Sequence, residues 1–182
     1  KFSDNFADQV DLDYCYGEVR NNIFQYKESP VLDVSSAPEV NGDGLDLSGS
    51  ELIVKNNSFL FFLDKAISVG ERTNTFLSYN KFEKNRSAVT LKDESKGFLF
   101  SNTYLDNSLN IEMFQKKRIF KHPMVYNFNE KHPSSKILKT PSSHYYKASK
   151  ASSEINGLTL LVQNKINSRL IDKTKFSWTE YE

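Results

Sequence analysis

Apolar and polar residues alternate in short blocks along the first two thirds of the chain. In the block Leu45-Asp46-Leu47-Ser48 the period of two is typical of a β-strand with one buried face. Matching blocks recur at a step of 22 residues, with their first apolar residues at Leu45, Ile67, Val89 and Ile111. A second short strand is predicted in each repeat, over residues 52–54, 75–77 and 98–100, because these segments are rich in strand-forming side chains.

Two further columns of residues follow the same repeat, at steps of 22 or 23. One is polar (Asn57, Asn80, Asn102) and the other is aromatic (Phe59, Phe82, Tyr104). Several columns in register predict a solenoid, and coils this short with strand-like blocks favour an all-β parallel β-helix. Its coils would stack about 4.8 Å apart. The asparagines are then expected to form a hydrogen-bonded ladder, and the aromatic residues an interior stack.

The 182 residues are expected to form a single β-helix domain. Clear repeats cover residues 7–117, with an insertion at about 25–40. Residues 118–155 are expected to be irregular or loop-rich, and residues 156–182 to form a final coil or cap. The chain does not begin with Met, so we expect a fragment of a larger protein. An open solenoid end is an unpaired edge, so a partner chain or a missing segment is expected to cover the N-terminal coil.

Charge and cysteine content exclude few classes of function. Lys and Arg number 24 against 23 Asp and Glu, a net charge of +1, which gives no reason to expect a nucleic-acid partner. No apolar run is long enough for a membrane-spanning helix. The single cysteine, Cys15, excludes an intrachain disulfide.

The polar positions of the first block of each coil would line one strip of one sheet, long and shallow enough for a sugar chain. The residues predicted to bind substrate there are Asp11, Asp13, Asp46, Glu71, Lys92 and Glu112. Stacked carboxylates repel each other, so Asp11, Asp13 and Asp46 are expected to attract a cation, and Ca²⁺ is one candidate. Lys65 could supply the positive charge without a metal. Each of these side chains could equally be a solvated residue of the polar face.

Residues 41–50 and 64–71 resemble repeats of the bacterial right-handed parallel β-helix proteins, the pectate lyase-like superfamily. The resemblance implies a right-handed solenoid. It also implies a protein that binds or processes polysaccharide, located outside the cell, at the cell surface or in the periplasm. A shared fold does not carry a shared activity, so the strip of polar residues has to support any such function itself.

The sequence allows more than one assignment of catalytic residues. Asp43 and Asp64 resemble the two acidic motifs of polygalacturonase-type hydrolases, whose carboxylates act as acid and base. The sequence departs from that family at Lys65, where a second Asp is expected, and it lacks the family's histidine motif after Asp64. A lyase or epimerase acting on a uronic-acid polymer is the other enzymatic reading, with Lys92 or Arg72 as the base. A third reading is a non-catalytic scaffold.

Overall fold

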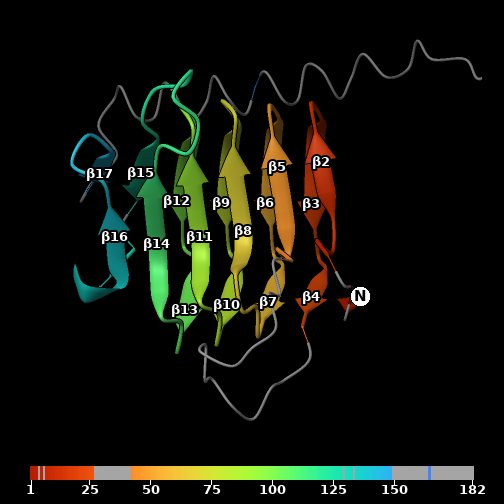
Figure 1. Ribbon diagram of the computed structural model, residues 1–182. Coiled ribbons are helices and arrows are strands. Elements are labelled where there is room, and N and C mark those ends of the chain that lie inside the picture. Colours follow the sequence, from red (N-terminus) through yellow and green to blue (C-terminus); the bar gives the residue numbers. More distant parts are fainter. Residues whose placement is uncertain are drawn as a thin grey trace, which may run out of the picture.

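A computed structural model describes residues 1–3, 5, 7–26, 42–128, 130–132, 134–148 and 164. The chain winds into a right-handed parallel β-solenoid of three sheets (Figure 1). The first sheet contains β2 (Asp11–Asp13), β5 (Leu45–Ser48), β8 (Lys65–Gly70), β11 (Ser87–Lys92), β14 (Leu109–Phe114) and β16 (Ile137–Lys139). The second contains β3 (Tyr16–Arg20), β6 (Glu51–Lys55), β9 (Asn74–Ser78), β12 (Lys96–Phe100), β15 (Met124–Phe128) and β17 (His144–Ala148). The third contains β1 (Phe2–Ser3), β4 (Ile23–Gln25), β7 (Ser58–Leu60), β10 (Lys81–Glu83) and β13 (Thr103–Leu105).

The strand register confirms the predicted repeat. Leu45 pairs with Ile67, Ile67 with Val89, and Val89 with Ile111, so the four residues stack across the first sheet. All four side chains are fully buried. The apolar member of each alternating block therefore faces the interior, and its polar neighbour faces outward.

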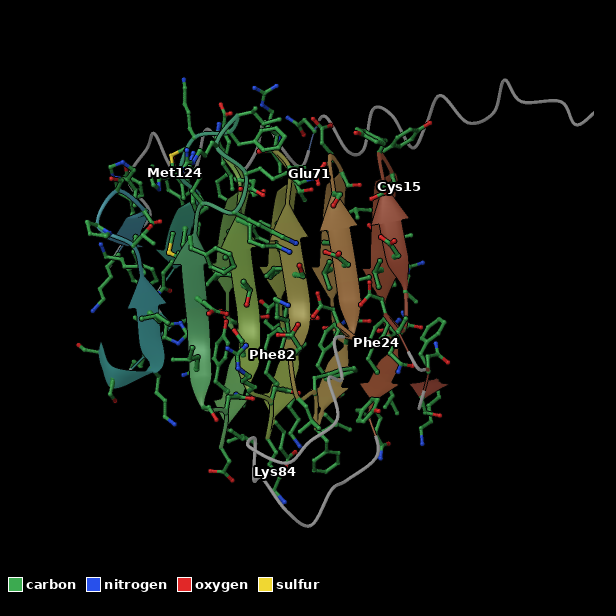
Figure 2. The ribbon with its side chains drawn as sticks, viewed as in Figure 1. Cys15, Phe24, Glu71, Phe82, Lys84 and Met124 are labelled. Atoms are coloured by element: carbon green, nitrogen blue, oxygen red, sulfur yellow. The ribbon has the colours of Figure 1, made fainter. Side chains whose placement is uncertain are left out.

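The aromatic column forms a continuous interior stack. Ring centroids are 4.7 Å apart between Phe24 and Phe59, and 5.2 Å apart from Phe59 to Phe82 and from Phe82 to Tyr104. Phe24 and Phe82 lie in β4 and β10 of the third sheet (Figure 2). Phe24, Phe59 and Phe82 are among the largest fully buried side chains of the core, and aromatic rings of this size bury a large apolar area.

The asparagine ladder is present as predicted. The backbone N–H and the side-chain Nδ2 of Asn57 both donate to Oδ1 of Asn80, at 3.0 and 3.1 Å. Asn80 donates in the same way to Oδ1 of Asn102, at 2.9 and 3.0 Å. The ladder begins one coil earlier, at Asn22. It satisfies the polar groups of a turn that is buried between two strands.

The turn before each ladder residue uses the left-handed backbone region. Asn21, Asn56, Tyr79 and Ser101 occupy the same position in successive coils and have φ between 54° and 58°. Asparagine tolerates this region better than tyrosine or serine does. The repeated geometry shows that neighbouring coils, rather than local preference alone, fix the conformation of this turn.

The regular coils extend further than the sequence suggests. Residues 118–155 were expected to be irregular or loop-rich, but their described part contains β15, the 3₁₀ helix η1 (Ser134–Lys136), β16 and β17. β15 pairs with β12 and β17 pairs with β15, both in parallel register. The insertion predicted at about 25–40 and the cap predicted at 156–182 lie almost wholly outside the described residues. None of the helices in the described part is long and apolar enough to cross a bilayer.

Candidate functional site: the outer face of the first sheet

A cluster of four charged residues lies at the starts of β5, β8 and β11. The ammonium of Lys65 lies 3.2 Å from Oδ1 of Asp43 and also pairs with Asp64. Arg86 Nη1 lies 3.2 Å from the other oxygen of Asp64. Both predicted acidic residues, Asp43 and Asp64, are therefore brought together, and Lys65 holds them in place of the second Asp of the hydrolase motif.

Asp43 is the most shielded member of this cluster, with a 7% exposed side chain. Burial raises the pKa of Asp43 to about 6, although the Lys65 ammonium acts in the opposite direction. Burial also acts to lower the pKa of Lys65, but the two carboxylates outweigh it and raise that pKa. Asp43 can consequently take up or release a proton near neutral pH, which a general acid or base requires.

A polar row runs across the middle of the first sheet. The register aligns Asp11 with Asp46, Asp46 with Ser68, Ser68 with Thr90, and Thr90 with Glu112. Thr90 Oγ1 donates to Glu112 Oε2 at 3.0 Å, and Ser87 Oγ lies 2.8 Å from Thr90 Oγ1. The outward column predicted from the sequence is therefore one continuous row in space.

This row is less open than the predicted groove. Ser68 and Thr90 are 0% exposed, and Glu112 is 8% exposed. Asp46 is half-buried, whereas Asp11 is exposed. Two atoms of the row, Asp46 Oδ1 and Ser68 Oγ, are buried and have no hydrogen-bond partner in the part of the chain that the structure describes.

Lys92 lies in the neighbouring outward column and is 8% exposed. Its side chain crosses Gly70, and its Cε is 3.6 Å from the position that a Cβ on Gly70 would occupy. Ser48 Oγ is 3.9 Å from the same position. Lys92 thus lies over Gly70 at ordinary van der Waals distance, on the side of the sheet that also carries Ser48.

The loop formed by residues 115–123 is held by hydrogen bonds and an ion pair to the turns that follow β8 and β11. Asp93 Oδ1 accepts the backbone N–H groups of Lys116 and Lys117, each at 2.7 Å. Lys117 also forms an ion pair with Glu71, which Figure 2 labels at the end of the first sheet.

Arg72 is also held at this loop. Its guanidinium lies over the ring of Phe120, 5.2 Å from the centroid, and its Nε lies 3.1 Å from Glu94 Oε2. Glu71 and Arg72, predicted as a substrate ligand and as a catalytic base, therefore hold this loop in place.

Asp11 and Asp13 lie on β2, in the first coil, and both are exposed. Burial and then the nearby carboxylates of Asp13, Asp46 and Asp8 raise the pKa of Asp11. Within the described ranges, no three Asp, Glu, His or Cys side chains are grouped so that they could hold a metal ion. Asp11, Asp13 and Asp46 thus do not converge into such a group in the described structure.

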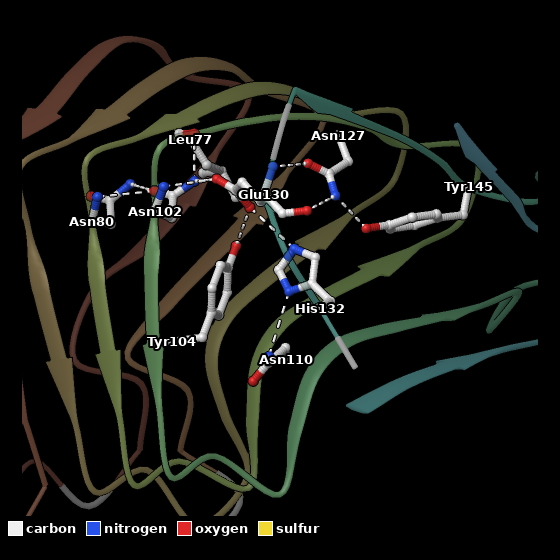
Figure 3. Close-up of polar contacts among 9 residues, drawn as sticks. All are labelled: Leu77, Asn80, Asn102, Tyr104, Asn110, Asn127, Glu130, His132 and Tyr145. Atoms are coloured by element: carbon white, nitrogen blue, oxygen red, sulfur yellow. Dashed lines mark hydrogen bonds and ion pairs between the residues drawn. The ribbon is translucent and has the colours of Figure 1, made fainter. Parts of the chain in front are cut away.

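A second polar cluster, inside the solenoid, ends the asparagine ladder (Figure 3). Glu130 Oε1 accepts the backbone N–H and Nδ2 of Asn102, at 2.8 and 2.7 Å. Glu130 Oε2 lies 3.0 Å from the hydroxyl of Tyr104 and 3.2 Å from Nε2 of His132. Asn110 Nδ2 lies 3.4 Å from His132 Nδ1, so both contacts are satisfied when Nδ1 accepts and Nε2 donates.

Glu130 continues the asparagine column and His132 continues the aromatic column. In the sequence-based prediction these columns end at Asn102 and Tyr104. Glu130 follows Asn102 in the ladder, and His132 packs edge-on against Tyr104 with centroids 4.6 Å apart. Burial, then the Glu130 carboxylate, raises the pKa of Tyr104 well above its usual range. The cluster lies beyond β13, at the end of the third sheet, and its Glu130 and His132 side chains are buried inside the solenoid rather than on the outer face of the first sheet.

A second ladder, of Asn85 and Asn107, was also missed. Asn85 donates from its backbone N–H and Nδ2 to Oδ1 of Asn107, both at 2.9 Å. Its own Oδ1 accepts the backbone N–H of Phe62 at 3.0 Å. The separation of 22 residues was a signal that could have revealed this pair.

Comparison of the chain with protein-family models, with curated proteins and with solved structures gave no match. The pectate lyase-like superfamily and a bacterial origin therefore stay predictions from the sequence. The function has to rest on the residues of the outer face.

Proposed function

We propose that the outer face of the first sheet binds a polysaccharide, in a protein that works outside the cell, at the cell surface or in the periplasm. The observation that carries this proposal concerns two buried polar atoms, Asp46 Oδ1 and Ser68 Oγ, which have no hydrogen-bond partner among the described residues and belong to residues that pair in register. A buried polar group without a hydrogen bond costs about 1–3 kcal/mol. A bound ligand that supplies hydroxyl groups would offset that cost.

Sugar hydroxyls suit this row because each can both donate and accept a hydrogen bond. Asp46 accepts only, when ionised, whereas Ser68 can do either. The polar row runs along the solenoid axis, which is the direction that an extended glycan would follow. The side chain of Lys92, which covers Gly70 beside this row, would have to move when the ligand binds.

Binding can be tested on a glycan array, followed by affinity electrophoresis in gels that contain the best polysaccharide. We expect Asp46→Asn with Ser68→Ala to weaken binding about tenfold or more, because two hydrogen-bonding groups are changed. Asp106→Asn is a matched control, since Asp106 is an exposed residue of a turn at the end of β13. Absence of binding to every neutral and acidic glycan, or equal loss in the control, would contradict the proposal.

Processing of the same glycan is a second candidate, which the raised pKa of Asp43 favours. Asp43 would transfer the proton, and Lys65 would set its charge state from 3.2 Å away. For a uronic-acid polymer, lyase activity would appear as an unsaturated product absorbing in the ultraviolet, and hydrolysis as new reducing ends. Activity that persists in Asp43→Asn would remove Asp43 from this role. If the protein shows no activity on several polymers, the remaining candidate functions are polysaccharide binding without catalysis and a non-catalytic scaffold.

A further inference from the structure

The loop formed by residues 115–123 ends in a tight turn that carries an exposed apolar side chain. The backbone N–H of Phe120 donates to the carbonyl of Lys117 at 3.1 Å, so Arg118 and Ile119 are the central residues of a β-turn. Gln115 Nε2 donates to the carbonyl of Phe120 and closes the loop below this turn. Ile119 is 79% exposed. The loop, which rises above the ends of β11 and β14 in Figure 1, thus holds an isoleucine in water, where its apolar surface is unfavourable.

Cations flank the turn on both sides. Lys116, Arg118 and Lys121 are exposed, and none of them forms an ion pair with a residue in the part of the chain that the structure describes. Lys117 differs from them because its ammonium pairs with Glu71. Three cations and one exposed apolar side chain therefore lie together within residues 116–121.

Three carboxylates next to the loop are already engaged in holding it. Glu71 pairs with Lys117, and Asp93 Oδ1 accepts two backbone N–H groups of the loop, each at 2.7 Å. Glu94 Oε2 lies 3.1 Å from Nε of Arg72. These carboxylates fix the backbone of the loop from below and leave the cations of the turn directed to solvent. A partner that binds the turn would therefore pay little to order it.

The acidic residues of the N-terminal coil lie too far away to cancel the positive charge of the turn. Asp11 and Asp13 are on β2, which is four strands from β14 in the order of the first sheet. At about 4.8 Å for each strand this separation is about 19 Å. The Debye length at physiological ionic strength is about 8 Å, so the repulsion or attraction between the two regions is largely screened.

We propose that the turn binds the surface of a negatively charged lipid bilayer. Lys116, Arg118 and Lys121 then lie at the level of the lipid phosphates. Ile119 lies between them and enters the boundary between head groups and acyl chains. Basic side chains are attracted by the negative potential of such a surface, and an apolar side chain beside them gains by leaving water.

The exposed isoleucine distinguishes a bilayer from other negatively charged partners. A soluble acidic polymer offers negative charge, but it has no apolar layer that could take up Ile119. A bilayer offers both at the depth of one side chain. The contact does not use the polar row of the first sheet, so it is independent of polysaccharide binding by that row.

Vesicle flotation of the full chain tests the proposal. Vesicles of equal parts phosphatidylcholine and phosphatidylserine are compared with vesicles of phosphatidylcholine alone. We expect the protein to float with the mixed vesicles only, and to be released from them in high salt. Lys116→Glu with Arg118→Glu should weaken binding about 25-fold or more, because each basic residue near the surface contributes about a factor of five. Ile119→Ser should weaken binding about tenfold, because the apolar contact is lost.

Two variants serve as matched controls. Tyr14→Ser removes a side chain that is also 79% exposed, and this residue follows β2 at the same edge of the first sheet. Lys55→Glu with Lys131→Glu changes the net charge by the same amount as the reversed loop, at exposed positions outside it. Both controls should float like the wild type, and circular dichroism checks that every variant is folded. If the reversed loop variant fails to fold, Lys116→Gln with Arg118→Gln replaces it and should weaken binding less.

Three results would overturn the proposal. The first is a protein that does not float with the mixed vesicles, and the second is an equal loss of binding in the controls. The third is unchanged binding of Ile119→Ser, because the loop would then recognise negative charge alone. Polygalacturonate, a soluble acidic polymer, checks that case directly, since its capture by the loop without any binding to vesicles would also contradict a lipid partner.

Discussion

Glu130 takes the place of an asparagine at the end of the ladder and accepts both amide donors of Asn102, at 2.8 and 2.7 Å. An asparagine side chain is one methylene shorter than glutamate. The longer side chain reaches Asn102 with one oxygen and leaves the other for Tyr104 and His132. The carboxylate therefore ends the ladder and the aromatic stack with one group.

Replacing Glu130 by alanine should lower the free energy of unfolding by about 3 kcal/mol or more, because several buried donors lose their acceptor. Glu130→Gln keeps one carbonyl oxygen for Asn102 and should cost about 1 kcal/mol. Urea denaturation followed by circular dichroism measures both values. Equal stability of the alanine and glutamine variants would contradict this account of the ladder end.

Asn80→Ala should be more destabilising than Asn22→Ala, although the two substitutions are chemically identical. Asn80 is buried and bonds to both neighbouring coils, and its Nδ2 also donates to the carbonyl of Val54 at 2.8 Å. Asn22 is only half-buried, and among the described residues it bonds to one neighbouring coil, at Asn57, and to the Arg20 carbonyl of its own coil at 2.9 Å. We expect a loss of about 3 kcal/mol for Asn80→Ala and about 1 kcal/mol for Asn22→Ala, measured by urea denaturation.

Ser68→Ala should stabilise the protein by about 1 kcal/mol, because it removes a buried hydroxyl without a partner in the described structure. Ser87→Ala is the matched control. Ser87 is equally buried, but its Oγ lies 2.8 Å from Thr90 Oγ1, so this variant should be destabilised by a similar amount. Thermal denaturation of both variants separates the two cases. Destabilisation by Ser68→Ala would mean that its hydroxyl has a structural partner, which would weaken the proposed binding site.

Asp43 should make stability fall as pH rises. Its pKa is about 6 in the folded protein against 3.8 for the ordinary side chain, so between these values the folded state holds the proton more tightly. The free energy of unfolding should therefore decrease from about pH 4 to pH 6, by up to about 3 kcal/mol from this group, and then level off. Asp43→Asn should remove that part of the decrease. Urea denaturation at several pH values tests it, and identical pH profiles for the two proteins would contradict it.

The columns of the repeat were predictable because they depend on register alone. A strand face alternates with period two and coils stack in steps, so Leu45, Ile67 and Val89 could be placed without knowing any contact. The predicted ladder of Asn57, Asn80 and Asn102 follows from the same geometry. The end of the repeat was not predictable in this way, because Glu130 follows Asn102 by 28 residues instead of 22 and so breaks the step.

The candidate site was predictable only in part. Sequence spacing placed Asp46, Ser68 and Thr90 in one outward row, and it placed Asp43 and Asp64 on neighbouring coils. It could not reveal that Ser68 and Thr90 would be shielded from solvent. Nor could it reveal the use of Glu71 and Arg72 to hold a loop. Burial depends on where long side chains and insertions fold back, and strand periodicity carries no information about either.

The loop formed by residues 115–123 replaces a three-residue corner, residues 93–95, of the preceding coil, yet the strands on both sides of it remain in register. The number of residues at this corner can therefore change without shifting the strand pairing of any coil. Arg118 and Ile119 are both exposed. A segment inserted between them would project into solvent and leave the pairing of the strands unchanged. Such corners are where related chains could diverge in what they recognise while their rungs stay the same.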